Sequence, residues 1–131
     1  MNFQQLYERA QLRQVSRTVS PFITAGAVST AILSGDGNIY TGVCIDSACS
    51  LGMCAERNAI ANMITNGEHE VTKLVTVMPD GKIGMPCGAC IELLMQLHPD
   101  HGNVEVLADL EDEQTIRLAQ LIPTWWGKDR H

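Results

Sequence analysis

Two short cysteine motifs constrain this chain more than any other feature of its sequence. The first is Met53-Cys54-Ala55-Glu56-Arg57, and the second, well downstream, is Met85-Pro86-Cys87-Gly88-Ala89-Cys90. Cys87 and Cys90 have the C-x-x-C spacing that places two thiolates on one tetrahedral metal ion. If Cys54 supplies a third thiolate, the fold must bring the two motifs together. The sequence therefore predicts a zinc ion, Zn2+, held by Cys54, Cys87 and Cys90.

A zinc site with three protein ligands keeps one coordination position open, which is the arrangement of catalytic rather than structural zinc. Glu56 follows Cys54 by two residues and can reach that position without being a ligand, as a general acid/base would. Arg57 stands beside the ligand and can donate a hydrogen bond to a thiolate from outside the metal's own ligand shell. Both motifs are expected at helix N-termini, whose partial positive charge offsets the negative charge of three thiolates.

Other interpretations of these residues remain open at this level. The C-x-x-C motif alone is also typical of a redox pair or of half a structural zinc site. A closed four-cysteine site with Cys44 or Cys49 as fourth ligand would be structural and inert, and it would leave Glu56 without a purpose. Glu56 and Arg57, each taken alone, are more often surface residues.

The composition and charge of the chain limit the kinds of binding partner that it can have. The 131 residues predict one domain over 1–131, and 45% hydrophobic residues suffice for a core. A net charge of −6 without a Lys/Arg run argues against a nucleic-acid polymer and favours a small neutral or cationic substrate. No apolar run has the length of a membrane span, and the polar segment 1–17 is unlike a signal peptide. The five cysteines, an odd number, are expected reduced in the cytoplasm, without a membrane partner.

The pattern of apolar residues predicts helices and strands in alternation. A helix is expected over 2–17 with Asn2 as N-cap, then a β-hairpin with strands 27–33 and 39–44 around the turn at 35–38. Further strands are expected at 73–77, 104–107 and 114–116, and further helices at 54–66, 86–98 and 118–122. Such interleaving predicts an α/β domain with helices on both faces of one sheet.

Several conspicuous side chains have simpler explanations than function. His98 and His101 flank Pro99-Asp100 and are expected on a surface turn, despite a spacing that metal sites also use. Trp125 and Trp126 are expected in packing or at an interface more than as a platform for substrate. Five methionines are most simply core filling: Met53, Met63, Met78, Met85 and Met95.

On these motifs the chain resembles the cytidine deaminase superfamily, specifically the small three-cysteine class that includes cytidine deaminases and blasticidin S deaminase. The resemblance spans nearly the whole chain and includes Asp36-Gly37 through Tyr40-Thr41-Gly42, Leu97-His98-Pro99 and Leu121-Ile122-Pro123. It implies Cys54, Cys87 and Cys90 as zinc ligands and Glu56 as the proton shuttle. It also implies a three-layer α/β/α sandwich around a five-stranded mixed sheet. The implied assembly is a homotetramer whose neighbouring subunits help to wall the active sites.

The chain departs from that family where the sugar is recognised. Nucleoside-specific members carry Asn-x-Glu after the second strand to grip the ribose, and here the stretch is Cys44-Ile45-Asp46. The usual Pro-Tyr-Ser with a following Phe is replaced by Pro21-Phe22-Ile23-Thr24 and small residues. The Arg-Gln after the last cysteine is replaced by Ile91-Glu92.

We expect Cys44, Asp46 and Ala55 near the substrate. In the blasticidin type an aromatic residue after Leu-Leu-Pro approaches the substrate, and Trp126 stands at the matching place. The resemblance thus implies zinc-dependent hydrolytic deamination of a cytosine-type nucleoside: cytidine, deoxycytidine or a modified one such as blasticidin S. The alternative is a catalytically silent zinc protein of the same fold that serves as an interaction or assembly module. Glu56 separates the two, because only the enzyme needs it.

Overall fold

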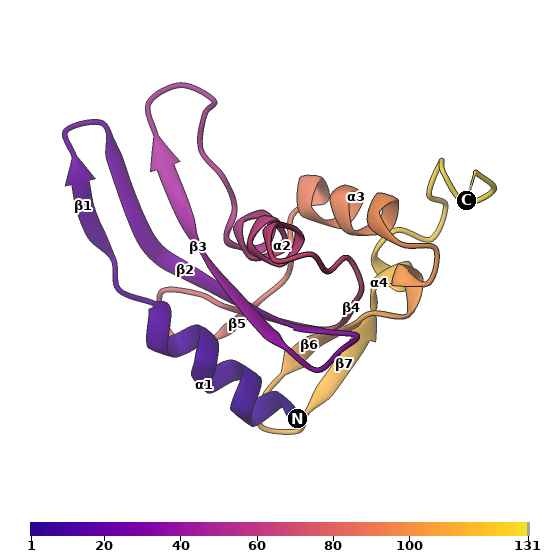
Figure 1. Cartoon of the computed structure of the whole chain (residues 1–131). Helices are drawn as coiled ribbons and strands as arrows, with labels where there is room; N and C mark the ends of the chain where they lie inside the picture. The colour runs from indigo at the N-terminus through magenta and orange to yellow at the C-terminus, as the bar shows by residue number, and fades with distance from the viewer. Residues whose placement is uncertain (131) are drawn as a thin grey trace.

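The computed structural model describes residues 1–130 and has helices on both faces of one twisted sheet (Figure 1). Its helices are α1 (Phe3–Arg13), α2 (Ala55–Thr65), α3 (Gly88–Leu97), α4 (Leu118–Leu121) and the 3-10 turn η1 (His101–Asn103). Its strands are β1 (Arg17–Ser20), β2 (Ile23–Ser34), β3 (Ile39–Ser47), β4 (Val71–Val77), β5 (Ile83–Gly84), β6 (Glu105–Asp109) and β7 (Gln114–Arg117). The predicted α/β/α layering is confirmed.

The sheet is mixed, as expected, but within residues 1–130 it has seven strands rather than five. The five predicted strands run side by side in the order β3-β2-β4-β6-β7, with β4 and β6 parallel and the other neighbours antiparallel. The two additional strands extend existing edges: β1 pairs with the first residues of β2, and β5 pairs with the end of β4. Their sequences gave no strand signal, because β1 is largely exposed and β5 has only two residues.

The first helix begins where expected and ends early. Asn2 is its N-cap, and the side chain of Asn2 accepts a hydrogen bond from the backbone of Gln5. The helix stops at Arg13 rather than Arg17 because the side-chain amide of Gln14 turns onto the sheet. It donates to three backbone carbonyls, those of Ala27, Val77 and Met78. Tertiary hydrogen bonds thus override the helical spacing.

Apolar side chains fill a core on each face of the sheet. On one face, residues of α1 pack against alternate residues of the strands; this core holds Phe3, Leu6, Ala10, Ala31, Leu33, Val75, Val77 and Leu107. On the other face α2, α3 and α4 pack around Ile32, Leu74 and Val106. Val75 and Val77 point toward α1, so the period-two alternation of a strand turns Thr76 toward α2.

His101 is buried, so the prediction that it lies on a surface turn is wrong. Only 1% of it is exposed. Its Nδ1 lies 2.7 Å from the carbonyl oxygen of Leu94, and its Nε2 accepts the backbone N–H of Val71 at 2.9 Å. His101 therefore joins α3 to β4, a contact between distant segments that the local sequence does not reveal. His98, which is half-buried, pairs with Glu70 at 3.1 Å.

None of the helices in the described part of the chain is both long and apolar enough to cross a bilayer.

Candidate active site

The two cysteine motifs lie at the starts of two neighbouring helices. Cys54 is the N-cap of α2 and Cys87 is the N-cap of α3, and neither helix start has a side-chain cap. Helix α2 lies unusually close to β3 at Gly42, where a Cβ would stand 2.7 Å from the carbonyl oxygen of Ala55. Because a glycine permits this approach, the start of α2 is pressed onto the sheet and Cys54 is fixed opposite Cys87.

The three predicted ligand atoms meet. The Sγ atoms of Cys54 and Cys87 are 3.3 Å apart, those of Cys87 and Cys90 are 3.2 Å apart, and all three lie within 4.8 Å of one another. With Zn–S bonds of about 2.3 Å, a tetrahedral site separates its sulfurs by about 3.8 Å, so this cluster fits zinc after a small expansion. In residues 1–130 no other group of three or more Cys, His, Asp or Glu side chains is so arranged.

Cys44 and Cys49 stay outside this group, and Cys49 is exposed. The described residues therefore do not form a closed four-cysteine site. With three thiols and one open side, the cluster has the catalytic arrangement of zinc ligands.

Hydrogen bonds around the sulfurs favour their charged forms unequally. Burial raises the pKa of Cys87, but hydrogen bonds from its neighbours, including the backbone N–H groups of Cys90 and Ala89, outweigh it and lower the pKa overall. Burial raises the pKa of Cys90. Arg57 donates from Nη2 to Cys54 Sγ at 3.7 Å, and its hydrogen bonds to Cys54 and Cys90 raise the pKa of its own guanidinium. Arg57 thus lies where it can donate hydrogen bonds to the thiols.

Glu56 is a buried carboxyl group beside the thiols. It lies in the first turn of α2 with 4% of its surface exposed. Burial raises its pKa, while its own backbone N–H, the Thr76 hydroxyl and the charge of Arg57 act in the opposite direction. A carboxyl group with a raised pKa takes up a proton more readily than an ordinary carboxylate, as a general acid/base requires.

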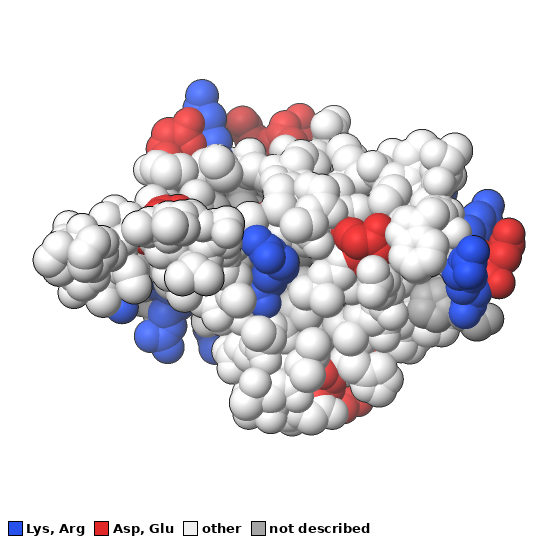
Figure 2. Space-filling view, turned by 90° about the horizontal axis from the view of Figure 1, so that it is seen from above, with Lys and Arg blue, Asp and Glu red and all other residues white. Residues whose placement is uncertain are grey.

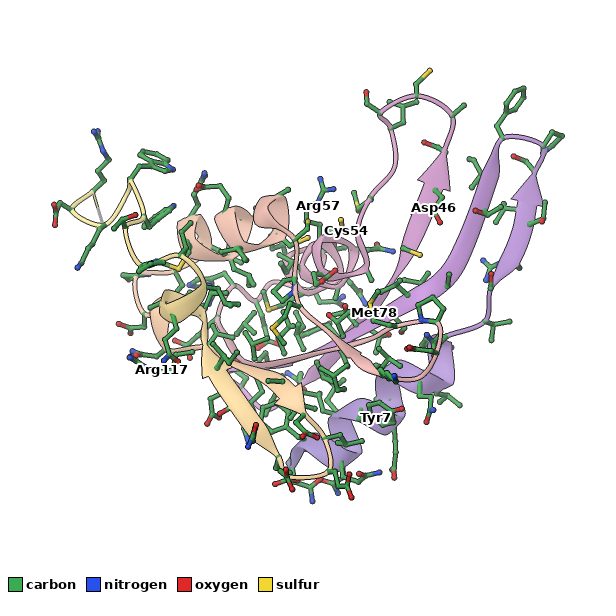
Figure 3. All side chains as sticks on the ribbon, turned by 180° about the vertical axis from the view of Figure 1, so that it is seen from behind. Tyr7, Asp46, Cys54, Arg57, Met78 and Arg117 are labelled. Atoms are coloured by element: carbon green, nitrogen blue, oxygen red, sulfur yellow. The ribbon has the colours of Figure 1, made fainter. Side chains whose placement is uncertain are left out.

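Glu56 and the thiols of Cys54 and Cys87 share one cavity of about 180 Å³. Its lining is Val28, Cys44, Cys54, Ala55, Glu56, Thr76, Met78, Met85 and Cys87. Figure 3 shows Cys54 and Arg57 together at the start of α2, with Asp46 on the neighbouring strand. Seen from above, this side of the molecule carries scattered Lys and Arg rather than a basic patch (Figure 2).

The structure brings three of the four expected substrate contacts together. Cys44 and Ala55 line the cavity, and Asp46 lines an adjoining hollow with Cys54 and Arg57. Trp126 lies apart from both cavities and is 63% exposed, with its indole N–H on the carboxylate of Glu92 at 2.9 Å.

Sequence reasoning missed several cavity residues. Val28, Thr76 and Met78 come from β2, β4 and the turn after β4, and no motif marks them. Met78 and Met85, expected as core filling, form part of the wall instead. Met85 could have been suspected, because it directly precedes Pro86 and Cys87.

The chain was compared with known protein families, sequences and structures. No protein-family model matches the chain. The chain is 32% identical over 104 residues to a cytidine deaminase of Mycobacterium tuberculosis, covering 79% of this chain and 74% of that protein. It is 33% identical over 98 residues to a cytidine deaminase of Halalkalibacterium halodurans, covering 73% and 74%.

The folds agree as well. A crystal structure of the Mycobacterium tuberculosis cytidine deaminase superposes with a TM-score of 0.78 at 24% identity, covering 97% of this chain and 98% of that one. The α/β/α sandwich with three clustered cysteines and a buried glutamate defines a zinc-dependent deaminase. The chain belongs to the cytidine deaminase superfamily.

Proposed function

We propose that this protein is a zinc-dependent hydrolase that converts a cytosine-type nucleoside to its uracil form with release of ammonia. The observation that carries the proposal is the burial of Glu56 in the same cavity as the thiols of Cys54 and Cys87. Burying a carboxyl group costs free energy, and a zinc protein without catalytic activity would gain nothing from it in this position. Cys54, Cys87 and Cys90 would hold the metal, and Arg57 would stabilise their charge.

Zinc, when bound, supplies a Lewis acid that makes water acidic enough to react near neutral pH. Glu56 accepts the proton that this water loses as its oxygen adds to C4 of the cytosine ring. Glu56 then delivers this proton to ring N3. As the bond between C4 and the amino group breaks, Glu56 takes the second proton from the new C4 hydroxyl and gives it to the departing amino group, so that water and the cytosine nucleoside become the uracil nucleoside and ammonia. Val28, Met78 and Met85 give the cavity apolar walls around Glu56.

The sugar is recognised differently from the Asn-x-Glu pattern. Cys44 Sγ accepts the backbone N–H of Val28 at 3.3 Å, and it lies 3.8 Å from a carboxylate oxygen of Asp46. A thiol is a weak hydrogen-bonding group, so Cys44 would contribute little to binding a ribose hydroxyl. The exposed Asp46 would accept a hydrogen bond from the sugar or from a cationic substituent. Cytidine, deoxycytidine and larger cytosine nucleosides such as blasticidin S are therefore the candidate substrates.

The assembly and the location are proposed from the resemblance to this family. We propose a homotetramer in the cytoplasm, supported by five free thiols and by large apolar side chains exposed on projecting segments. Trp126 is proposed as a substrate contact supplied across a subunit boundary, because its ring is exposed and does not line the cavity of its own chain.

A deamination panel tests the proposal. Zinc-loaded protein is offered cytidine, deoxycytidine, 3′-deoxycytidine, free cytosine and blasticidin S, and ammonia release is measured. We expect turnover of at least one nucleoside, with kcat/KM for cytidine close to that for the 3′-deoxy analogue. A ratio above about a thousand would mean that another group grips the hydroxyl, because such discrimination requires a polar partner left unpaired. No turnover of any of these compounds would contradict the proposed function.

A further inference from the structure

Two threonines form a buried pair beneath the first turn of α2. Thr30 on β2 and Thr76 on β4 are directly opposite in the antiparallel register. Their exposed fractions are 0% and 1%, and their Oγ1 atoms are 2.8 Å apart. Both side chains lie on the face of the sheet that α2 covers, where Ile32 and Leu74 are their apolar neighbours.

The surroundings of the pair leave room for a helix above it. Gly42 is the partner of Thr30 on β3, and Gly84 is the partner of Thr76 on β5. The pair therefore sits in a transverse row with a glycine at each end, and α2 presses onto that row at Gly42. Buried hydroxyls cost free energy unless they are hydrogen-bonded, and valine has nearly the same shape. Packing alone gives no reason for threonine at either place.

Glu56 supplies the reason. Thr76 lines the same cavity as Glu56 and Cys54, and hydrogen bonding by its hydroxyl acts to lower the pKa of the Glu56 carboxyl group. Each hydroxyl has one hydrogen. When Thr76 donates its hydrogen to Glu56, its oxygen must accept the hydrogen of Thr30. The three side chains then form one directed chain of hydrogen bonds that ends on the carboxylate.

We propose that Thr76, supported by Thr30, is a positioning residue for Glu56. It fixes one carboxylate oxygen so that the other faces the reacting water and the amino group of the substrate. This role rests on the proposed function, in which Glu56 carries the proton.

The test replaces each hydroxyl by a methyl group of similar shape. Thr76→Val should lower kcat about tenfold, the effect of losing roughly one hydrogen bond in the transition state, while KM stays within about twofold and zinc content is unchanged. Thr30→Val should cause a smaller loss, about threefold in kcat. Thr76→Ser, which keeps the hydroxyl, should restore kcat.

The control is Thr72→Val on the same strand. Thr72 is exposed, and its hydroxyl donates to the carbonyl oxygen of Leu33 at 3.2 Å, away from the cavity. It should leave kcat unchanged. In a Glu56→Gln background, Thr76→Val should cause no further loss, because its effect passes through Glu56.

A crystal structure of Thr76→Val gives a second result that needs no turnover. We expect the Glu56 carboxyl group to leave the position that it holds in the parent protein. An unmoved Glu56, an unchanged kcat, or a lower kcat that is explained by lost zinc would each overturn the positioning role. If the parent protein deaminates no nucleoside, the proposed function fails, and the position of Glu56 still decides this inference.

Discussion

At the scale of single residues, opposing influences are balanced on Glu56. Burial raises the pKa of its carboxyl group, and hydrogen bonds and the charge of Arg57 lower it, with burial the larger effect. A raised pKa makes this carboxyl group a better proton acceptor than an ordinary carboxylate, which suits a group that takes up and returns protons. The position of Glu56 after Cys54 was predictable from the motif. The hydroxyls that control it were not, because Thr30 and Thr76 come from other strands.

His101 carries the clearest pH dependence of stability. Burial lowers its pKa, and protonation at Nε2 would also abolish the hydrogen bond from the Val71 N–H. The pKa in the folded state is below the unfolded value of about 6.5, so the unfolded chain binds the proton more tightly. The contribution of His101 to stability is full above that value and is lost as pH falls toward the folded pKa. The charges of His69, His98 and Glu70 also act on this ring and shift the pH range over which the contribution is lost.

Denaturant unfolding at pH 7.5, 6.0 and 5.0 measures this prediction. The free energy of unfolding should fall as the pH is lowered. His101→Leu should cost about 1–3 kcal/mol at pH 7.5 by leaving the Val71 N–H without a partner, and it should flatten the pH dependence. Asp112→Asn, at an exposed position whose charge is not among those that act on His101, is the control and should retain the slope. An equally steep slope in His101→Leu would show that other groups cause it.

At the scale of helices and strands, the site depends on how closely α2 lies on the sheet. A Cβ at Gly42 would collide with the backbone of the first turns of α2, closest at the N of Ala59 and also at the carbonyl oxygen of Ala55. Gly42→Ala should therefore displace the start of α2 and cost about 1–3 kcal/mol of stability, as overpacking does. Because Cys54 is the N-cap of this helix, zinc affinity should fall with it.

The matched control for Gly42→Ala is Gly88→Ala at the start of α3, where a Cβ meets nothing within 4 Å. It should keep both the melting temperature and the zinc content of the parent protein. Equal behaviour of the two variants would show that the close approach at Gly42 does not position the metal ligands.

The elements that were predicted correctly carry strong local signals. The hairpin of β2 and β3 closes with the backbone bonds of Ser34, Gly37 and Asn38 that its turn residues favour. Helix α1 begins at a capping residue. The early end of α1 at Gln14, the strand β1 and the burial of His101 depend on contacts with distant segments. A sequence pattern that reports only local preference misses them.

At the scale of the whole molecule, two segments project from the body beside the site: the β1–β2 hairpin and the loop between β3 and α2 (Figure 1). They carry Phe22 and Leu51, which are 73% and 84% exposed. Apolar side chains on projecting segments are typical of interfaces. The single chain explains the metal ligands and Glu56, and the assembly would account for these exposed apolar residues and for Trp126.

Light scattering at micromolar concentration tests the assembly. We expect a particle of about four times the 14.3 kDa chain mass. Phe22→Asp should dissociate it partly or wholly, because a buried unpaired charge is costly at an interface. Glu111→Gln, on an exposed turn away from the projecting segments, should leave the mass unchanged. A monomeric parent protein would remove the proposal that a neighbouring chain supplies Trp126.

The most direct measurement of the central claim compares Glu56→Gln with Cys87→Ala in one assay of bound zinc and nucleoside deamination. We expect the parent protein to hold about one zinc per chain, as three ligands around one open position require. Glu56→Gln should keep the zinc and lose kcat by on the order of a hundredfold or more, the scale of general acid/base catalysis. Cys87→Ala should lose zinc and activity together. A well-folded parent protein without zinc, or a Glu56→Gln variant that deaminates as fast as the parent, would contradict the account.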